Sequence, residues 1–330
     1  MDGGDAGKTR TMKKTVCVTG AGGFVASWLV QRLLSRGDYL VRGTVRDPSD
    51  PKNAHLMALD GAGERLRLFK ADLLDRASVA AAVAGCDGVF HVASPVPAVE
   101  PTNPDVEIMA PAVTGTQNML EASHAANVRR VVVVSSVAAV IANPTSIPDD
   151  AVADEDCWSD EDYCRATKNW YCLSKTVAER EALAYGERTG MDVVTVCPPW
   201  VLGPLLQPTV NATSMGFVKY LKGENTDEKR RNMVDVRDVA DALVLTYETP
   251  EAAGRRYICS AHAMKVSEII SLVSSLYPDL KLHYPREFVQ KEDEKGVSSK
   301  RLQALGWKFR TVEETLRDTI DSYKAAGILN

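Results

Sequence analysis

The chain has 330 residues, of which 45% are hydrophobic and 25% are charged. These values are ordinary for a globular protein and exclude a disordered or collagen-like chain. Its 44 acidic and 39 basic residues give a formal net charge of −5, which argues against binding to nucleic acid, because phosphate neutralisation requires a basic excess. The seven cysteines are too few for a disulfide framework and form no zinc-ligand pattern with the five histidines, so we expect no metal site.

The N-terminal segment, residues 1–13, is polar and predicts a loose tail. It lacks the apolar stretch of a signal peptide, and no later run is long and apolar enough for a membrane span. We therefore expect a cytoplasmic protein that does not contact membranes.

Short runs of β-branched and other apolar residues alternate with longer stretches of helical spacing from Thr15 onward. The runs cover residues 15–19, 39–45, 66–69, 88–92, 131–134 and 193–196. Nearly continuous Val and Ile runs are typical of strands that are covered on both faces. The alternation predicts an α/β fold with a doubly wound parallel sheet, a Rossmann domain over residues 14–197.

The rhythm breaks after Cys197, where a Pro- and Gly-rich stretch, CPPWVLGPLLQP, begins. Residues 198–330 are expected to form mainly a smaller substrate-binding domain, and it stays open whether 234–260 returns to the large sheet. Thr311 and Glu314 have the spacing of a capping box, which predicts a last helix from Val312.

A glycine-rich turn joins the first predicted strand to the first predicted helix. Backbone N–H groups at such a turn and the positive end of the helix dipole bind a pyrophosphate, which glycine allows to approach closely. A glycine triplet alone also occurs in ordinary turns, but its place in a strand–turn–helix unit favours dinucleotide binding. The expected cofactor-binding residues are Gly20, Ala21, Gly22, Gly23, Phe24, Val25 and Ala26.

The end of the second predicted strand indicates which dinucleotide binds. An NAD site usually has an acidic residue here, whereas the 2′-phosphate of NADP needs a cation. This chain has Arg46, with Lys52 in the loop that follows. NADP is therefore favoured, unless both are solvated charges paired with Asp47 or Asp50.

Two further strand ends are expected to contact the cofactor, because open α/β sheets bind ligands at the carboxyl ends of their strands. Asp72 and Leu73 follow the third strand, and Val92, Ala93 and Ser94 follow the fourth.

Tyr171 and Lys175 lie four residues apart in a predicted helix, so both side chains emerge on one face. A nearby ammonium is expected to lower the pKa of the tyrosine toward the range of an acid–base catalyst. Ser136, after the fifth predicted strand, is expected to hold the carbonyl oxygen that Tyr171 protonates.

Together these motifs resemble the extended short-chain dehydrogenase/reductases over almost the whole chain, residues 14–329. More narrowly, VTGAGGFVASW, HVASPV, DEDCWSD and KNWYCLSKTVAE resemble the cinnamoyl-CoA reductases and the dihydroflavonol reductases. The resemblance implies NADPH-dependent reduction of a hydroxycinnamoyl-CoA thioester to an aldehyde, with Ser136, Tyr171 and Lys175 catalytic. It also implies that the nicotinamide is bordered by Pro198, Pro199, Trp200, Val201 and Thr213.

The chain departs from that family at positions expected to bind substrate. Leu173 and Ser174 replace Tyr-Gly, Gly216 replaces a histidine, and Val266 replaces an arginine, although Lys219 is retained. Glycine and valine side chains donate no hydrogen bonds to a substrate. An alternative function therefore stays open, in which the chain reduces a free aldehyde or ketone and has little activity on CoA thioesters. A silent NADP-binding regulator is a third interpretation, against which the retained Tyr171 and Lys175 argue. The expected binding partner is a small-molecule phenylpropanoid, either free or as a CoA thioester. For the oligomeric state, a monomer is favoured.

Cys157 and Cys164 match a cysteine pair in the same family. Their spacing does not define a disulfide geometry, and two thiols are favoured in a reducing compartment.

Overall fold

A seven-stranded parallel sheet forms the centre of the computed structural model, which describes residues 13–96, 101–144, 151–280, 282 and 287–329. The strand order is β11-β7-β5-β4-β1-β2-β3, and every neighbouring pair is parallel. The order reverses between β1 and β4, so the predicted doubly wound sheet is confirmed. The strands are β1 (Lys14–Val18), β2 (Tyr39–Val45), β3 (Leu66–Lys70), β4 (Gly88–His91), β5 (Arg130–Val134), β7 (Asp192–Cys197) and β11 (Arg256–Ile258).

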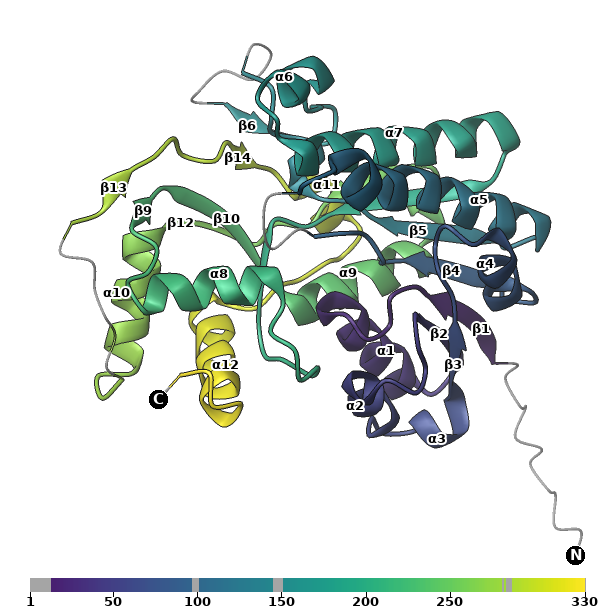
Figure 1. The fold of residues 1–330 in the computed structure, drawn as a ribbon, viewed down its shortest axis with the longest axis horizontal. Coiled ribbons are helices and arrows are strands. Elements are labelled where there is room, and N and C mark those ends of the chain that lie inside the picture. The colour runs from purple at the N-terminus through teal and green to yellow at the C-terminus, as the bar shows by residue number, and fades with distance from the viewer. Residues whose placement is uncertain (1–12, 97–100, 145–150, 281, 283–286, 330) are drawn as a thin grey trace, which may run out of the picture.

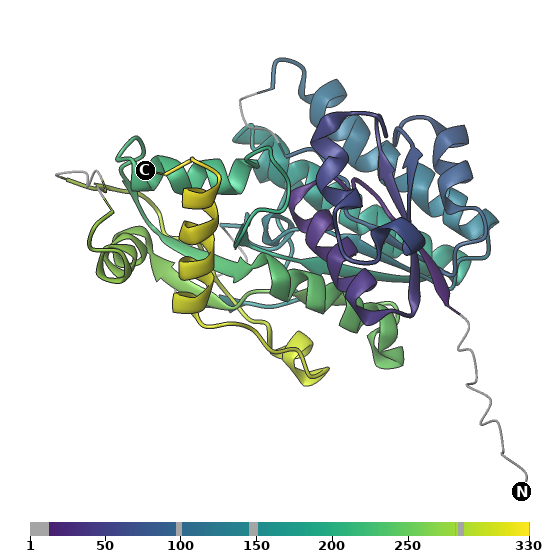
Figure 2. The ribbon, with the colours of Figure 1, turned by 90° about the horizontal axis from the view of Figure 1, so that it is seen from below.

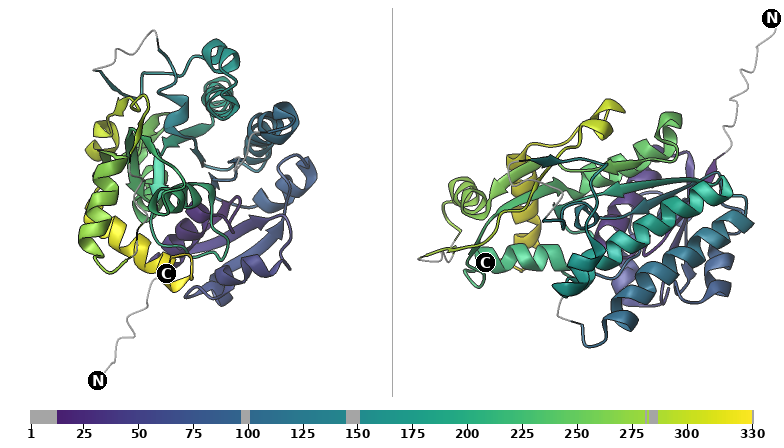
Figure 3. Two further views of the ribbon diagram at one scale, coloured as in Figure 1. Left: turned by 60° about the vertical axis from the view of Figure 1, so that its left-hand side comes forward. Right: turned by 90° about the horizontal axis from the view of Figure 1, so that it is seen from above.

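Helices cover both faces of this sheet (Figure 1). In β1, Val16 and Val18 pack into the core beneath α1, whereas Cys17 packs into the core beneath α4 and α5, as alternation along a strand requires. Figure 3 shows α7 beside α5 on one face, and Figure 2 shows α1 and α9 on the other. These helices are α1 (Phe24–Arg36), α4 (Arg76–Val83), α5 (Gly115–Ala125), α7 (Trp170–Thr189) and α9 (Val236–Glu248).

The segment 236–258 returns to the large sheet. Helix α9 packs against α1, and β11 pairs with β7 at the sheet edge. The Tyr247 ring at the end of α9 lies 5.0 Å from that of Phe90 on β4, centroid to centroid. Through these contacts the C-terminal part of the chain packs against the sheet that carries the glycine turn.

The remaining C-terminal residues form a smaller unit around a three-stranded sheet of order β12-β10-β8. Its apolar core includes Trp200, Phe217, Met233 and Tyr323, and three helices pack around it (Figure 1). Thr311 caps the last helix through a bond from the Glu314 N–H, as predicted. The elements are β8 (Trp200–Leu202), β10 (Arg230–Asp235), β12 (His262–Lys265), α8 (Ala212–Leu221), α10 (Val266–Leu276) and α12 (Val312–Ala325).

One extended segment connects the two parts. It pairs first with the small unit, β13 with β9, and then with the segment before α7, β14 with β6. These short strands are β6 (Val152–Ala153), β9 (Asp227–Glu228), β13 (Val289–Gln290) and β14 (Gly296–Val297).

Short helices complete the fold, and none of the helices in the described residues is long and apolar enough to cross a membrane. They are α2 (Ala54–Met57), α3 (Ala62–Arg65), α6 (Glu161–Ala166), α11 (Lys300–Ala304), the 3-10 turns η1 (Pro51–Asn53), η3 (Val137–Ala139) and η4 (Pro250–Ala252), and the π-helix η2 (Asp105–Thr114).

Candidate active site

The glycine turn forms a close-packed cradle between β1 and α1. Gly20 has a φ of +64°, and a Cβ there would lie 3.0 Å from the Ala93 side chain. A Cβ at Gly22 would collide with the Asn53 side chain. The Gly23 N–H donates to the Gly20 carbonyl at 2.8 Å, and α1 begins directly after Gly23. The cradle therefore presents glycine backbone at a helix N-terminus, which fits a dinucleotide pyrophosphate.

Polar side chains at two strand ends hold this cradle in place. The Thr19 hydroxyl accepts from the N–H groups of Val92 and Ala93, both at 2.9 Å. The Thr44 hydroxyl accepts from the Gly20 N–H at 3.2 Å. Thr19, Thr44 and Asn53 were not predicted from the sequence, although Thr19 directly precedes the glycine turn and Thr44 lies at the end of β2.

The two predicted 2′-phosphate ligands differ in their surroundings. Arg46 is exposed after β2, and its guanidinium has no partner among the described residues. The Lys52 ammonium is paired with Asp50 at 2.7 Å. Asp47 does not pair with Arg46, because its carboxylate accepts from the hydroxyl and the N–H of Ser49, which lower its pKa. An unpaired cation beside the cradle fits a 2′-phosphate.

The other expected cofactor residues surround the same strand ends. Asp72 caps the turn after β3 by accepting from the Leu74 N–H at 2.9 Å, and the Leu73 carbonyl accepts from Asn118 at 2.8 Å. Val92, Ala93 and Ser94 are half-buried after β4, and Phe24, Val25 and Ala26 form the first turn of α1.

Ser136 and Tyr171 meet above the end of β5. Ser136 precedes η3, its hydroxyl accepts from the Ala138 N–H at 3.1 Å, and its side chain also bonds that of Tyr171 in the first turn of α7. Part of the Tyr171 side chain is exposed, but burial of its hydroxyl end raises the pKa, and the bond to Ser136 opposes this rise. The sequence led us to expect a lowered pKa. Desolvation outweighs the other effects on Tyr171, and the phenol is neutral, as a proton donor must be.

Lys175 lies beneath Tyr171 on the same face of α7. Its ammonium is 5.9 Å from the centre of the Tyr171 ring and donates to the Val134 carbonyl at 3.4 Å. Burial lowers the pKa of Lys175 to about 8, and the charge of the Glu179 carboxylate opposes this change. The Lys175 side chain is therefore mostly cationic at neutral pH. Burial, together with the nearby Lys175 charge, lowers the pKa of His91 to about 3.

Glu179, one turn beyond Lys175, anchors this face of the helix, and the sequence analysis missed it. Its buried carboxylate accepts from Ser135 at 2.7 Å and Thr195 at 2.6 Å, and is paired with Arg256 at 2.8 Å. The Arg256 guanidinium lies 3.5 Å from the centre of the Trp158 ring. The repetition of Tyr171, Lys175 and Glu179 at intervals of four residues was the available signal.

The chain leaves the large sheet beside Ser136. The Pro198 carbonyl accepts from the Val137 N–H at 3.1 Å, and Pro198, Pro199, Trp200 and Val201 are all buried. The indole N–H of Trp200 donates to the Thr213 carbonyl at 3.2 Å, where α8 begins. These contacts place the start of the small unit next to Ser136.

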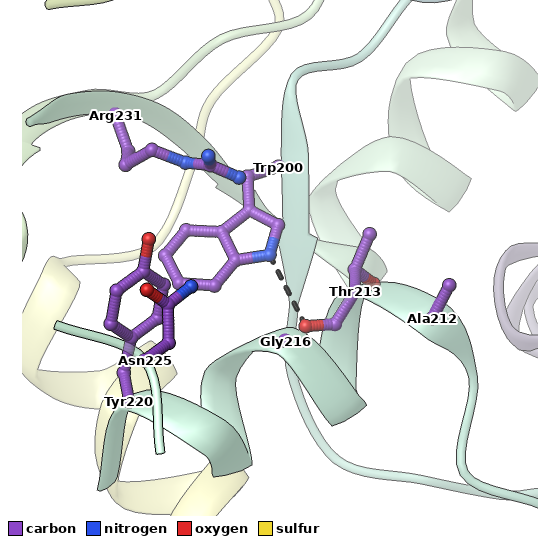
Figure 4. A pocket seen from close by; sticks show the side chains of 7 residues that line it. All are labelled: Trp200, Ala212, Thr213, Gly216, Tyr220, Asn225 and Arg231. Atoms are coloured by element: carbon purple, nitrogen blue, oxygen red, sulfur yellow. Dashed lines mark hydrogen bonds between the residues drawn. The ribbon is translucent and has the colours of Figure 1, made fainter. Parts of the chain in front are cut away.

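A pocket of about 210 Å³ lies between β8, α8 and β10 (Figure 4). Gly216 is on its wall, whereas Lys219 is exposed on α8 and is not among the lining residues. Val266 is 1% exposed and packs in the apolar core of the small unit. The lining residues are Trp200, Ala212, Thr213, Gly216, Tyr220, Asn225 and Arg231.

The seven cysteines, all within the described residues, are thiols. Cys164 is buried in α6, and Cys157 is half-exposed with its sulfur 3.7 Å from an Asp154 carboxylate oxygen.

Residues 16–260 match the NAD dependent epimerase/dehydratase family, and the chain belongs to that family. It is 47% identical to cinnamoyl-CoA reductase 1 of Petunia hybrida over 96% of this chain and 94% of that protein. It is also 42% identical to tetraketide alpha-pyrone reductase 1 of Arabidopsis thaliana over 96% of this chain and 98% of that protein.

Two solved structures share the fold. Vestitone reductase from alfalfa is 34% identical, with a TM-score of 0.83 over 96% of this chain and 100% of that chain. Gre2 from Candida albicans in complex with NADPH is 25% identical, with a TM-score of 0.80 over 95% and 99%. The chain is therefore a reductase that uses a nicotinamide cofactor.

Proposed function

We propose that this chain uses NADPH to reduce the carbonyl group of a phenylpropanoid-type substrate, with a hydroxycinnamoyl-CoA thioester as the first candidate and an aldehyde as its product. The observation that carries the proposal is the arrangement of Ser136, Tyr171 and Lys175 at the carboxyl end of the sheet, beside the glycine cradle. Similarity to cinnamoyl-CoA reductase supports the substrate class. The unpaired Arg46 supports NADPH rather than NADH.

In this reaction the protein supplies a proton and holds the oxygen. A bound nicotinamide supplies the hydride, which adds to the carbonyl carbon. The neutral Tyr171 phenol donates its proton to the carbonyl oxygen as negative charge develops there, and the Ser136 hydroxyl donates a hydrogen bond to the same oxygen. With a thioester, the resulting hemithioacetal hydroxyl then gives up its proton as the carbon–sulfur bond breaks. The leaving sulfur takes up a proton, and an aldehyde remains.

Lys175 supports the proton transfer through its charge. Its ammonium stabilises the phenolate that Tyr171 becomes after donating its proton. It also fits the role of binding the nicotinamide ribose, because it lies at the end of β5 beside the tyrosine. Glu179 and Arg256 hold the helix face that positions both residues.

Reduction of a free aldehyde or ketone is the second candidate function. Gly216 and Val266 donate no side-chain hydrogen bonds to a CoA group, and Val266 is buried in the core. A substrate without CoA needs fewer such contacts. The relation to tetraketide alpha-pyrone reductase is consistent with a substrate outside the cinnamoyl-CoA class.

A screen of NADPH consumption distinguishes these candidates. Purified protein would receive cinnamoyl-CoA thioesters, cinnamaldehydes or dihydroflavonols, with product identification by mass spectrometry. Aldehyde formation from the thioesters is the result we expect. Turnover confined to free aldehydes or ketones would favour the second candidate, and no NADPH consumption with any compound would contradict the proposed function.

A further inference from the structure

Gly216 lines the pocket between β8, α8 and β10 (Figure 4). Apart from the backbone of its own helix and its chain neighbours, no atom lies within 4 Å of a Cβ built at Gly216, so there is room for a side chain at this position. The Trp200 indole and the Tyr220 ring line the pocket and pack edge to face on each other, with their centroids 6.1 Å apart. A volume of about 210 Å³ is enough for a substituted aromatic ring, since a cavity of about 150 Å³ holds benzene.

Arg231 supplies the charged group of this pocket. It comes from β10, and its guanidinium lies 4.8 Å from the centre of the Trp200 ring. Its Nε is 3.3 Å from a Glu294 carboxylate oxygen. The two terminal NH₂ groups have no acceptor within the part of the chain that the structure describes, so a planar pair of donors remains for a ligand.

Glu294, the ion-pair partner of Arg231, lies in the segment between β13 and β14 and accepts from the Asn232 N–H at 3.0 Å. The pair therefore joins this segment to β10 at the pocket.

We propose that this pocket binds an oxygen-rich group of the carbonyl substrate, and that Arg231 is the residue that recognises it. The proposal rests on the proposed function, because it takes the substrate carbonyl to lie at Ser136 and Tyr171. Both a ring oxygen of the acyl part and a phosphate of a CoA part offer acceptors to a guanidinium. Arg231 thus supplies a charged hydrogen-bond donor to the pocket, whereas Gly216 has no side chain that could donate.

Arg231→Met tests the recognition, because it removes the donors and keeps an apolar stem over Trp200. The KM is expected to rise at least about tenfold for substrates that bear the recognised oxygen group, with a small change in kcat. Arg231→Lys should recover part of the loss, since it restores the charge without the planar fork. Arg230→Met is the matched control, because the adjacent side chain leaves the opposite face of β10 and donates to the Ala263 carbonyl at 3.2 Å.

Paired substrates identify the source of the oxygen group. One pair differs in the 4-hydroxyl of the ring, and the other compares a cinnamoyl-CoA thioester with the same acyl group on a short thiol without phosphates. The Arg231→Met effect should disappear with the member that lacks the recognised group. For compounds without turnover, calorimetry on NADP⁺-loaded protein gives the dissociation constant instead.

Gly216→Leu tests whether the substrate occupies the pocket beside residue 216, and Gly216→Ala is its control. Leucine favours a helix interior more than glycine does, so the variant should fold as well as the parent chain. The KM should rise for every substrate that uses the pocket with leucine and change little with alanine.

The outcomes separate the two proposals. Normal turnover with an unchanged KM in Arg231→Met and Gly216→Leu would overturn the pocket and leave the proposed function intact. Absent turnover, together with weaker binding in Arg231→Met, would overturn the proposed function and retain the pocket. If no compound is turned over or bound, both proposals are wrong.

Discussion

The carboxyl edge of the large sheet and the pocket of the small unit are built on different principles. At the sheet edge the polar groups are paired: Ser136 with Tyr171, Lys175 with a backbone carbonyl, and Glu179 with Arg256. In the pocket, the two terminal NH₂ groups of Arg231 have no acceptor among the described residues, and Gly216 lines the same pocket without a side chain. Under the two proposals above, a closed network holds the reacting groups, whereas substrate recognition depends on groups that are available for a ligand.

Tyr171→Phe should produce the largest effect, because it removes the proton donor and keeps the ring. The kcat is expected to fall by about 10²–10⁴, while the dissociation constant for NADPH stays within about twofold. Stopped-flow NADPH oxidation and a fluorescence titration provide the two measurements. An unchanged kcat would show that the closed network at the sheet edge does not perform the chemistry.

Glu179→Gln should lower the free energy of unfolding by about 3–5 kcal/mol, since it leaves the buried Arg256 charge without its carboxylate. Urea unfolding followed by circular dichroism measures this loss. Glu187→Gln, an exposed position on the same helix, is the control and should change stability by less than about 0.5 kcal/mol. Equal stability of both variants would contradict the anchoring role of the network.

Arg46→Asp should lower the preference for NADPH over NADH by about tenfold to a hundredfold, because it replaces a charge-assisted donor with a like charge. The ratio of kcat/KM for the two cofactors gives the effect. Lys52→Ala should change the ratio less, since Asp50 already pairs with that ammonium. An unaltered ratio in Arg46→Asp would show that Arg46 does not bind the 2′-phosphate.

The pH dependence should be the smallest effect. Lys175 is cationic below its lowered pKa of about 8 and loses its charge as the pH rises through that value. The reduction rate should therefore decline above pH 8, and Lys175→Arg should shift the decline to higher pH because arginine stays protonated. A wild-type rate that is constant to pH 10 would show that the Lys175 charge is not required.

The motifs that the sequence revealed are local ones. The glycine turn lies between two adjacent elements, and the spacing of Tyr171 and Lys175 is one helical repeat, so periodicity was enough to find them. The parallel sheet was predictable because its Val-rich strands are buried on both faces. The raised pKa of Tyr171 was not, because it depends on how completely the folded chain removes the hydroxyl from water.

Contacts between distant residues needed the tertiary structure. Glu179 and Arg256 meet only because β11 returns beside β7, and Arg231 reaches the pocket only because β10 lies beside β8. The sequence by itself determined the fold class and the positions of the glycine turn and of the Tyr171–Lys175 pair, since each depends on neighbouring residues and buried periodicity. Only the tertiary structure decided which charges are paired and which remain available, because that depends on packing between segments far apart in the chain.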